Sequence, residues 1–262
     1  MVNSDRGQVV LITGGSRGIG EGIARAFVSA GAAVVICGRD SKTGEAAAGE
    51  MNGAGPGTCR FTRCDVSKSE DNERLIRTTV EDMGRLDCLI NNAGWHPPYV
   101  PIDEFSVAEF VQLLRLNLVS YFELSRLALP ALRLSGGSII NVGSLVGTIG
   151  QEGATMYCAT KGGIDGLTRA LAVDEARHGV RVNAVLPGAI ETPLYREYLD
   201  GQADPEEAER LVARWQWMGR VGQPAEVGAV CVFLASEAAS FVTGVGIPIS
   251  GGAELAYGYK WI

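Results

Sequence analysis

Three residues near the middle of the chain have the types and spacing of a proton-transfer site: Ser144, Tyr157 and Lys161. Tyr157 and Lys161 stand four residues apart in an Ala/Gly/Leu-rich stretch of helical period, so they are expected on one helix face. A phenol with a pKa of about 10 is a poor base at neutral pH, and a nearby ammonium lowers that pKa by stabilising the phenolate. Ser144 ends a short apolar run of strand length. Together the three residues could move a proton to or from an alcohol or carbonyl oxygen.

Tyr-x-x-x-Lys alone also fits an ordinary amphipathic helix with a surface lysine, so the surrounding elements must decide between the two interpretations. Seven short, continuous apolar runs are typical of buried parallel strands: Gln8–Thr13, Ala33–Cys37, Thr58–Arg63, Asp87–Asn91, Gly137–Val142, Val180–Leu186 and Val245–Ile249. Helical patterns lie between them, near 18–30, 42–52, 68–83, 107–133, 156–177 and 224–235. This alternation predicts an α/β fold: a single doubly wound (Rossmann-type) domain over residues 1–262, with a seven-stranded parallel sheet and helices on both faces.

The composition argues against several classes of function. A formal net charge of −7 and a pI near 5.0 disfavour a nucleic-acid or anionic-membrane partner. Six cysteines without a C-x-x-C pair favour buried free thiols in a reducing compartment, and only two histidines argue against a His-rich metal site. The first strand begins by Gln8 and no apolar run approaches the roughly 20 residues of a membrane helix. We therefore expect no signal peptide, no membrane segment and a cytoplasmic location.

A glycine-rich turn, Thr13–Gly20, connects the first expected strand to the first expected helix. Glycines let the backbone approach a pyrophosphate closely, and the start of the helix supplies free N–H donors and a positive dipole. The spacing is G-x-x-x-G-x-G rather than the commoner G-x-G-x-x-G, and a lone glycine cluster also fits a mere tight turn. Its place at the first β-to-α turn favours a dinucleotide site formed by Gly14, Ser16, Arg17, Gly18, Ile19 and Gly20.

The second expected strand leads into Gly38-Arg39-Asp40, where the side chains bear on the choice between NAD and NADP. An acidic residue here would accept from the adenosine 2′-hydroxyl of NAD, whereas an arginine suits the 2′-phosphate of NADP. Arg39 and Arg17 of the glycine loop could clamp a phosphate between two guanidiniums. Asp40 could still reach a ribose hydroxyl if the loop turns inward. The residues favour NADP, and NAD stays open.

Two further segments follow strands of the expected sheet, Cys64–Val66 after the third and Asn91–Gly94 at the end of the fourth. The carboxyl ends of parallel strands form the ligand crevice of a doubly wound sheet, so both segments are expected beside the cofactor. Asp65 could accept from the adenine amino group, or it could cap a helix beginning at Ser67. The two asparagines could bind loop backbone and hold the crevice open. The cofactor contacts predicted here are Cys64, Asp65, Val66, Asn92, Ala93 and Gly94.

Taken together, these motifs resemble the short-chain dehydrogenase/reductase family over nearly the whole chain. The likeness rests on seven features in the family's order: Thr13–Gly20, Asp65-Val66, Asn91–Gly94, Asn117, Ser144, Tyr157/Lys161, and Pro187-Gly188 with Thr192. A closer likeness, to type-14 17β-hydroxysteroid dehydrogenases, lies in 91–98, 144–151, 223–228 and 251–257. Members of that group are NAD-dependent and carry an acidic residue where this chain has Gly38-Arg39, so the sequence departs from them at the cofactor.

The resemblance implies an NAD(P)-dependent oxidoreductase that transfers hydride between the nicotinamide and a secondary alcohol or ketone, with 17β-hydroxysteroid-like and sugar substrates both open. It implies that Tyr157 exchanges the substrate proton, that Lys161 lowers the pKa of Tyr157 and holds the nicotinamide ribose, and that Ser144 binds the substrate oxygen. Asn117 would bind a water linking Lys161 to solvent, although by itself it fits an ordinary polar residue on an apolar helix face. The nicotinamide would be held by Pro187, Gly188, Ile190 and Thr192.

Two alternatives to this function stay open. An NADPH-dependent carbonyl or 3-oxoacyl-thioester reductase is favoured by Gly38-Arg39, but the basic patch expected for an acidic carrier is not evident in the sequence. A catalytically idle nucleotide-binding regulator is the alternative from another class of protein. The intact set of Ser144, Tyr157 and Lys161 argues against that regulator.

Substrate contacts are expected from the loops that flank the catalytic residues. His96, in a Trp-His-Pro-Pro turn, and Gln151 both lie beside such loops, although His96 also fits a partly solvated loop histidine. Residues 189–219 form an aromatic-rich insertion, which is either a substrate wall or lid or a small subdomain packed onto the sheet. The candidate substrate contacts are His96, Ser144, Gln151, Tyr157, Tyr195 and Tyr257.

The resemblance also implies a homotetramer. The helical segments 107–133 and 156–177 carry more aliphatic surface than one sheet face needs, and the family uses them in a four-helix dimer interface. The tail Gly252–Ile262 is apolar for an exposed terminus. We expect the tail to pack at a subunit interface, with Tyr257 near the active site of a neighbouring subunit.

Overall fold

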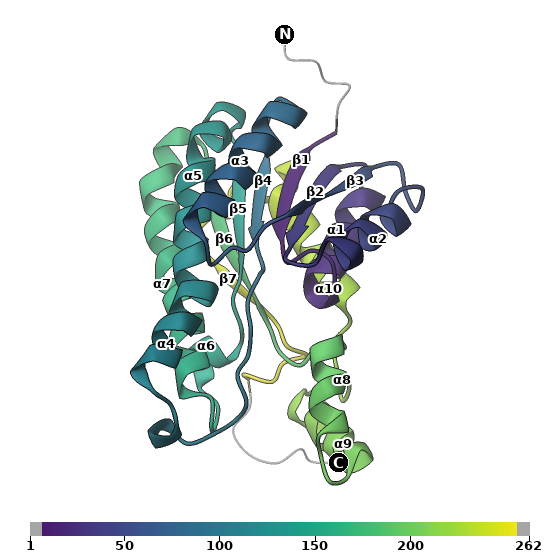
Figure 1. The fold of residues 1–262 in the computed structure, drawn as a ribbon, viewed down its shortest axis with the longest axis vertical. Helices are drawn as coiled ribbons and strands as arrows, with labels where there is room; N and C mark the ends of the chain where they lie inside the picture. The colour runs from purple at the N-terminus through teal and green to yellow at the C-terminus, as the bar shows by residue number, and fades with distance from the viewer. Residues whose placement is uncertain (1–6, 256–262) are drawn as a thin grey trace.

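The computed structural model describes residues 7–255, which are built around a seven-stranded parallel sheet with the strand order β3-β2-β1-β4-β5-β6-β7 (Figure 1). The strands are β1 (Val9–Thr13), β2 (Ala33–Gly38), β3 (Thr58–Arg63), β4 (Cys88–Asn91), β5 (Ser138–Val142), β6 (Arg181–Pro187) and β7 (Gly246–Ile249). The order reverses between β1 and β4, which is where doubly wound sheets bind their ligands. The predicted Rossmann-type fold class is confirmed.

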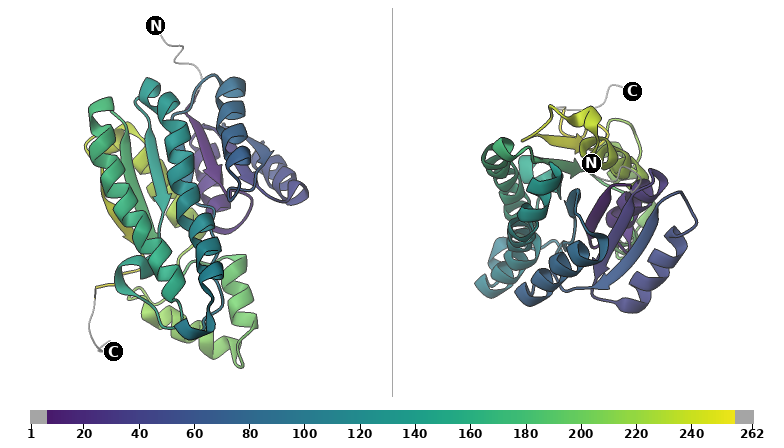
Figure 2. Two further views of the ribbon diagram at one scale, coloured as in Figure 1. Left: turned by 60° about the vertical axis from the view of Figure 1, so that its left-hand side comes forward. Right: turned by 90° about the horizontal axis from the view of Figure 1, so that it is seen from above.

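Helices cover both faces of the sheet (Figure 2). One face carries α1 (Gly18–Ser29), α2 (Ser41–Met51) and α10 (Pro224–Ala235), which bury Ile23, Phe27 and Met51 against the strands. The other face carries α3 (Ser69–Met83), α5 (Ser120–Ser135) and α7 (Thr155–Glu175), which bury Leu75, Leu124 and Leu132. Burying side chains of this size contributes about 1.5–3 kcal/mol each, so the two apolar layers hold the strand ends in place.

The helix predicted over 107–133 is not one regular helix. It consists of α4 (Val107–Leu114), a π-helical turn (Arg115–Val119) and α5. The apolar period of the sequence runs through the π turn, which is why the pattern predicts a single element. Such turns often occur at functional sites, and this one places the buried Asn117.

The carboxyl ends of the strands face a separate lobe made from the 189–219 insertion (Figure 1). The lobe contains α8 (Pro193–Asp200) and α9 (Pro205–Trp215), and it has a small core of its own formed by Tyr195, Leu199 and Val212. The Thr192 hydroxyl caps α8 by accepting from the Tyr195 N–H, and Pro193 occupies the first turn. The insertion therefore forms a folded wall over one side of the strand ends.

Short helical segments complete the fold. They are α6 (Val146–Ile149) and the 3₁₀ turns Ile102–Glu104, Ala176–His178 and Glu237–Ala239. Over residues 7–255, the helices are too short or too polar to cross a membrane.

Candidate active site

The structure brings Ser144, Tyr157 and Lys161 together beyond the carboxyl end of β5. Ser144 follows that strand directly after Gly143, and the other two residues lie one turn apart near the start of α7. The Ser144 hydroxyl hydrogen-bonds the Tyr157 phenol, which works to lower the phenol's pKa. The Lys161 Nζ lies 5.6 Å from the centre of the Tyr157 ring. The three residues thus form one contiguous polar cluster.

The electrostatics of this cluster differ from the prediction that Lys161 lowers the pKa of Tyr157. Burial raises the pKa of the Tyr157 phenol, and the hydrogen bond from Ser144 offsets that effect only in part. Burial also lowers the pKa of Lys161 to about 7. The closest acceptor for its ammonium is the Val142 carbonyl at 2.9 Å rather than the phenol oxygen. In the protein alone, desolvation therefore dominates both groups and favours their neutral forms.

Asn117 is adjacent to this cluster, and its side chain is hydrogen-bonded to protein groups. Its Nδ2 donates to the Trp95 carbonyl at 2.9 Å and to Thr160 Oγ1 at 3.3 Å. Its Oδ1 accepts from the Trp95 N–H at 3.0 Å. Since both amide protons have acceptors and Oδ1 has a donor, the side chain fixes the backbone of the loop after β4.

The glycine loop has the shape of a phosphate cradle. Gly14 has a φ of +64°, and a Cβ atom there would lie 3.1 Å from the Ala93 Cα. A Cβ at Gly20 would lie 2.2 Å from the Gly14 carbonyl oxygen, so only glycine fits. Arg17 is the N-cap residue of α1, and its side chain makes no cap hydrogen bond. The N–H groups at the start of α1 are thus available to a pyrophosphate, and the residues present fit a dinucleotide.

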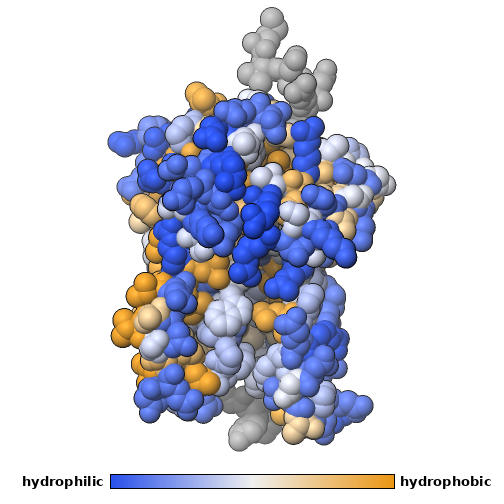
Figure 3. Space-filling view, viewed as in Figure 1, coloured by the Kyte–Doolittle hydropathy of each residue, from blue (hydrophilic) through white to orange (hydrophobic). Residues whose placement is uncertain are grey.

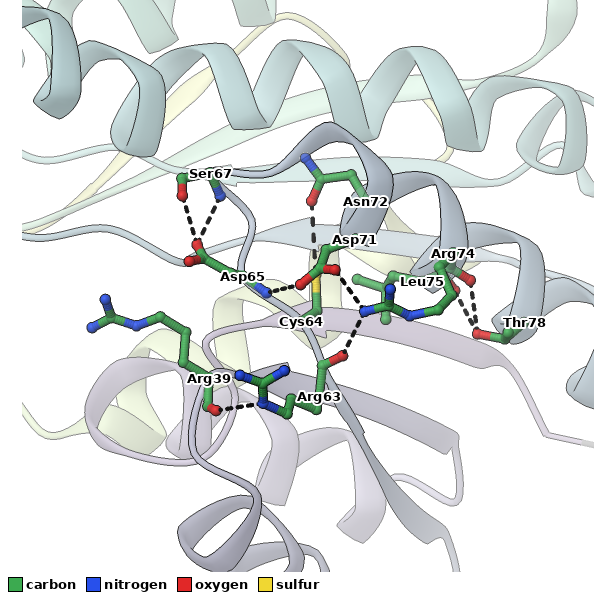
Figure 4. A network of polar contacts seen from close by, with 10 residues as sticks. All are labelled: Arg39, Arg63, Cys64, Asp65, Ser67, Asp71, Asn72, Arg74, Leu75 and Thr78. Atoms are coloured by element: carbon green, nitrogen blue, oxygen red, sulfur yellow. Dashed lines mark hydrogen bonds and ion pairs between the residues drawn. The ribbon is translucent and has the colours of Figure 1, made fainter.

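At the adenosine end, Figure 4 shows the Arg39 guanidinium without a dashed contact, whereas Asp65 and Asp71 nearby are hydrogen-bonded. Asp40 does not turn inward, because its Oδ1 caps α2 by accepting from the Thr43 N–H at 2.7 Å. The Arg39 carbonyl accepts from Arg63 Nε at 3.2 Å. The guanidiniums of Arg17 and Arg39 are exposed and have no hydrogen-bond or ion-pair partner within residues 7–255.

Asp65 and Cys64 follow β3, and their side chains have partners within the protein. Asp65 Oδ1 accepts from the N–H and the hydroxyl of Ser67, and because α3 begins at Ser69, Asp65 does not cap that helix. The Cys64 side chain is buried, with its Sγ 3.7 Å from Asn72 Oδ1. Cys64 can therefore offer a cofactor only its backbone, whereas Asp65 still presents a carboxylate oxygen.

The two asparagines after β4 act in different ways. Asn92 Nδ2 donates to the carbonyls of Thr13 at 2.8 Å and Gly14 at 3.1 Å, so Asn92 binds loop backbone as predicted. Asn91 does not bind loop backbone: its Nδ2 donates to Asn141 Oδ1 at 2.9 Å inside the sheet. Asn141 in turn donates to Thr168 Oγ1. This buried chain ties β4, β5 and α7 together, and its members are too far apart in sequence for spacing to reveal it.

A large cavity of about 1910 Å³ opens between the Ser144 cluster and the lobe. Tyr157 lines it, together with the predicted substrate contacts His96, Gln151 and Tyr195. Several predicted cofactor contacts line the same cavity: Ile19 of the glycine loop, and Pro187, Gly188, Ile190 and Thr192 on the nicotinamide side. These predicted substrate and nicotinamide contacts thus surround one space, whereas predicted contacts at the adenosine end, such as Arg17 and Arg39, are not part of its lining. Tyr257 lies outside the described residues.

His96 stacks beside Tyr157, with ring centres 4.2 Å apart. Its Nδ1 lies 2.6 Å from the Pro97 carbonyl oxygen, and its Nε2 is buried without a hydrogen-bond partner in the described part of the chain. Burial lowers the pKa of His96, while the nearby Gln151 acts in the opposite direction. Tyr99 was not among the predicted contacts, yet its ring centre lies 4.7 Å from that of His96 and its hydroxyl accepts from Gln151 Nε2 at 3.3 Å. The loop that carries Tyr99 has no periodic pattern in its sequence from which this contact could be predicted.

Comparison with known proteins decides the family. A family model described as enoyl-(acyl carrier protein) reductase matches residues 14–254. L-fucose dehydrogenase of Oryctolagus cuniculus is 52% identical over 252 residues, which cover 96% of this chain and 87% of that protein. The chain belongs to the short-chain dehydrogenase/reductase family.

Solved structures of this family superimpose closely on the fold. The Cj0485 dehydrogenase has a TM-score of 0.92 at 29% identity and is covered, like this chain, over 100% of its length. The ligand-free aldohexose dehydrogenase of Thermoplasma acidophilum has a TM-score of 0.87 at 31% identity, with 97% of each chain covered. The protein is thus an NAD(P)-dependent oxidoreductase acting on CH–OH groups of sugars or secondary alcohols, as the sequence predicted.

Proposed function

We propose that this dehydrogenase oxidises a sugar such as L-fucose, with NADP⁺ as the preferred hydride acceptor. The observation that carries the sugar assignment is that Nε2 of His96, buried beside Tyr157, has no hydrogen-bond partner among residues 7–255. A relative that is 52% identical is named an L-fucose dehydrogenase, which supports the same substrate class.

The protonation state of His96 follows from its contacts. A carbonyl oxygen can only accept, so the 2.6 Å contact with Pro97 requires the proton on Nδ1. Because burial lowers the pKa of His96, the ring is neutral near pH 7 and Nε2 is a hydrogen-bond acceptor. A buried acceptor without a donor is costly, and a substrate hydroxyl would remove that cost. The substrate hydroxyl that reacts would bind Ser144 and Tyr157. A donor for Nε2 would therefore be a second hydroxyl of the substrate, close to the first.

A sugar meets this requirement better than a steroid does. The hydroxyls on neighbouring carbons of a sugar can reach His96 and the reacting pair together, whereas a 17β-hydroxysteroid offers one hydroxyl at that end. Aromatic rings from Trp95, Tyr198 and Trp215 also line the cavity and could pack against the C–H faces of a sugar ring. The Tyr195 hydroxyl, buried in the lobe that forms one wall, has no hydrogen-bond partner in the described part of the chain and is a further polar group for the substrate.

The reacting residues would divide the work as their positions suggest. Ser144 would orient the substrate oxygen, and Tyr157 would take the hydroxyl proton because the two side chains are already hydrogen-bonded. Lys161, one helical turn further along α7, would hold the phenolate and the nicotinamide ribose through its ammonium. The bound nicotinamide supplies the hydride-accepting carbon. The nicotinamide ring would be positioned from the other side of the cavity by the segment from Pro187 to Thr192.

The preference for NADP⁺ rests on charge at the adenosine end. Two exposed guanidiniums, of Arg17 and Arg39, have no acidic partner within residues 7–255, and Asp40 is engaged as the cap of α2. A 2′-phosphate would receive charge-assisted hydrogen bonds from both arginines. Gly14, Gly18 and Gly20 would bring the backbone to the pyrophosphate, and Asp65 would accept from the adenine amino group.

We also propose that the protein assembles as a homotetramer. Apolar side chains stand exposed on the helices that the family uses for assembly, with Val111 on α4, Phe122 on α5 and Val173 on α7. In Figure 3 apolar residues gather at the lower left, over α4, whereas the upper part of this face is hydrophilic. Light scattering of the purified protein would determine the number of subunits.

One set of measurements tests substrate and cofactor together. Reduction of NAD⁺ and of NADP⁺ is followed by absorbance at 340 nm with L-fucose and with estradiol, and a simple ketone with NADPH tests the reductase alternative. Calorimetry measures the binding of both dinucleotides. We expect L-fucose to be oxidised and NADP⁺ to bind more tightly. Faster turnover of estradiol would refute the sugar assignment, and tighter binding of NAD⁺ would refute the cofactor assignment.

A further inference from the structure

Tyr121 is a fully buried tyrosine on α5 with no role in the chemistry described so far. It stands four residues after Asn117, so the π turn brings its side chain to the same part of the site. Its phenol oxygen lies 3.3 Å from the Val142 carbonyl oxygen, and since a carbonyl can only accept, the phenol donates. Tyr121 is thus anchored to the last residue of β5.

Lys161 is bonded to the same carbonyl, with its Nζ 2.9 Å from the Val142 oxygen. Val142 lies one residue beyond the last pair that β5 forms with β4, Asn91 with Asn141. The Nζ lies 5.8 Å from the centre of the Tyr121 ring and 5.6 Å from the centre of the Tyr157 ring. The ammonium therefore contacts two aromatic rings that reach it from different helices.

We propose that Tyr121 is a positioning residue whose ring supports the buried ammonium of Lys161 beside the reacting phenol. The negative face of an aromatic ring attracts a cation, and the attraction is stronger where water is excluded, as it is here. The hydroxyl of Tyr121 fixes the ring against the carbonyl that also accepts from Lys161. Tyr121 thereby offsets part of the desolvation that burial imposes on the ammonium. The proposal rests on the proton-transfer role assigned to Tyr157 and Lys161.

Lys161 has few groups around it that can stabilise its positive charge, so its contact with the Tyr121 ring matters. The titratable groups that face it are Tyr157 on its own helix, Tyr121 on α5 and His96 in the loop after β4. Two further close neighbours, Gly94 and Asn117, are neutral. Gly94 is so close that a Cβ atom added to it would lie 3.8 Å from Lys161 Nζ and 3.3 Å from Asn117 Oδ1. Lys161 has no carboxylate ion-pair partner within the part of the chain that the structure describes. The hydrogen bond to the Val142 carbonyl and the contacts with the two aromatic rings are therefore the main interactions that offset the cost of burying the Lys161 ammonium.

The test is a direct titration of Lys161, which needs no turnover. The chain has only four lysines, Lys42, Lys68, Lys161 and Lys260, so side-chain NMR of ¹³C,¹⁵N-lysine-labelled, cofactor-free protein can follow each one against pH. Tyr121→Leu removes the ring, and Tyr121→Phe is the matched control that keeps it. We expect the Leu variant to lower the pKa of Lys161 by about 0.5–1.5 units and the Phe variant to stay within about 0.3 units of wild type.

Two results would overturn the proposal: an unchanged or raised pKa in Tyr121→Leu, or an equal shift in Tyr121→Phe, which would assign the effect to the hydroxyl. If Tyr121→Leu does not fold, as judged by circular dichroism, Tyr121→Met replaces it with the same expectation. The pH profile of kcat/KM for the oxidised substrate should move in the same direction in the folded variant. Absence of sugar oxidation would contradict the proposed function, but it would leave the titration of Lys161 and this proposal intact.

Discussion

The burial of Lys161 predicts that its replacement by methionine stabilises the protein in a pH-dependent way. Burial lowers the pKa of Lys161 from 10.5 to about 7 in the folded chain. Between these two values the unfolded chain binds the proton more tightly than the folded chain does. The free energy of unfolding therefore rises with pH across this window, and the full cost of burying the charge is present below about pH 7.

The size of the effect follows from the shift. One pKa unit corresponds to about 1.4 kcal/mol, so the cost of burying Lys161 amounts to about 5 kcal/mol at pH 6. Roughly 3 kcal/mol of that cost is relieved by pH 9, where the folded chain has lost the proton. Lys161→Met removes the cost at every pH. Its stability advantage over wild type should therefore be larger at pH 6 than at pH 9 by about 3 kcal/mol.

Urea unfolding of the cofactor-free protein at pH 6, 7, 8 and 9 measures this advantage. Taking the difference between the variant and wild type at each pH cancels the titration of every other group. Lys42→Met is the control, because Lys42 is exposed on α2 and the substitution therefore removes a lysine without removing a buried charge. An advantage for Lys161→Met that stays constant between pH 6 and pH 9 would refute the depressed pKa.

Three further predictions concern single contacts. Arg39→Ala should weaken NADP⁺ binding at least 10-fold by calorimetry and leave NAD⁺ binding nearly unchanged, since a charge-assisted hydrogen bond contributes about 1.5–3 kcal/mol; equal losses for both dinucleotides would contradict it. Asn117→Ala should reduce the free energy of unfolding in urea by about 1–3 kcal/mol, because it leaves Trp95 backbone groups unpaired; a neutral effect would contradict that account. His96→Phe keeps a ring beside Tyr157 but should raise the KM for a sugar about 10-fold, and an unchanged KM would remove His96 from the substrate site.

The strands and the reacting residues could be predicted because local patterns determine them. Continuous apolar runs such as Val9–Thr13 are typical of parallel strands that are buried on both faces of a sheet. Helical spacing places Tyr157 and Lys161 on one face, and the strand-to-loop boundary places Ser144 opposite them. The glycine loop was recognisable because glycine alone tolerates the close approach at Gly20.

The features that the sequence did not reveal depend on contacts between distant elements. The depressed pKa of Lys161 comes from burial under α5 and the loop after β4, which spacing does not encode. The π turn at Asn117 leaves the apolar period unbroken, and the partners of Asn91 lie 34 and 50 residues further along the chain. The sequence left open whether Asp40 reaches a ribose hydroxyl, and only the path of the loop into α2, where Asp40 accepts from the Thr43 N–H, decides against it.

The central claim is that Tyr157 carries the proton transfer in an NADP⁺-dependent oxidation of a sugar. Its most direct test compares wild type with Tyr157→Phe for L-fucose turnover at 340 nm, with NADP⁺ binding measured on both proteins. The phenyl ring keeps the packing against His96 and removes only the hydroxyl. We predict that turnover falls at least 100-fold, the lower end of what a general acid–base contributes, while the Kd for NADP⁺ stays within about threefold. Turnover of L-fucose by Tyr157→Phe at a rate close to wild type would contradict the account.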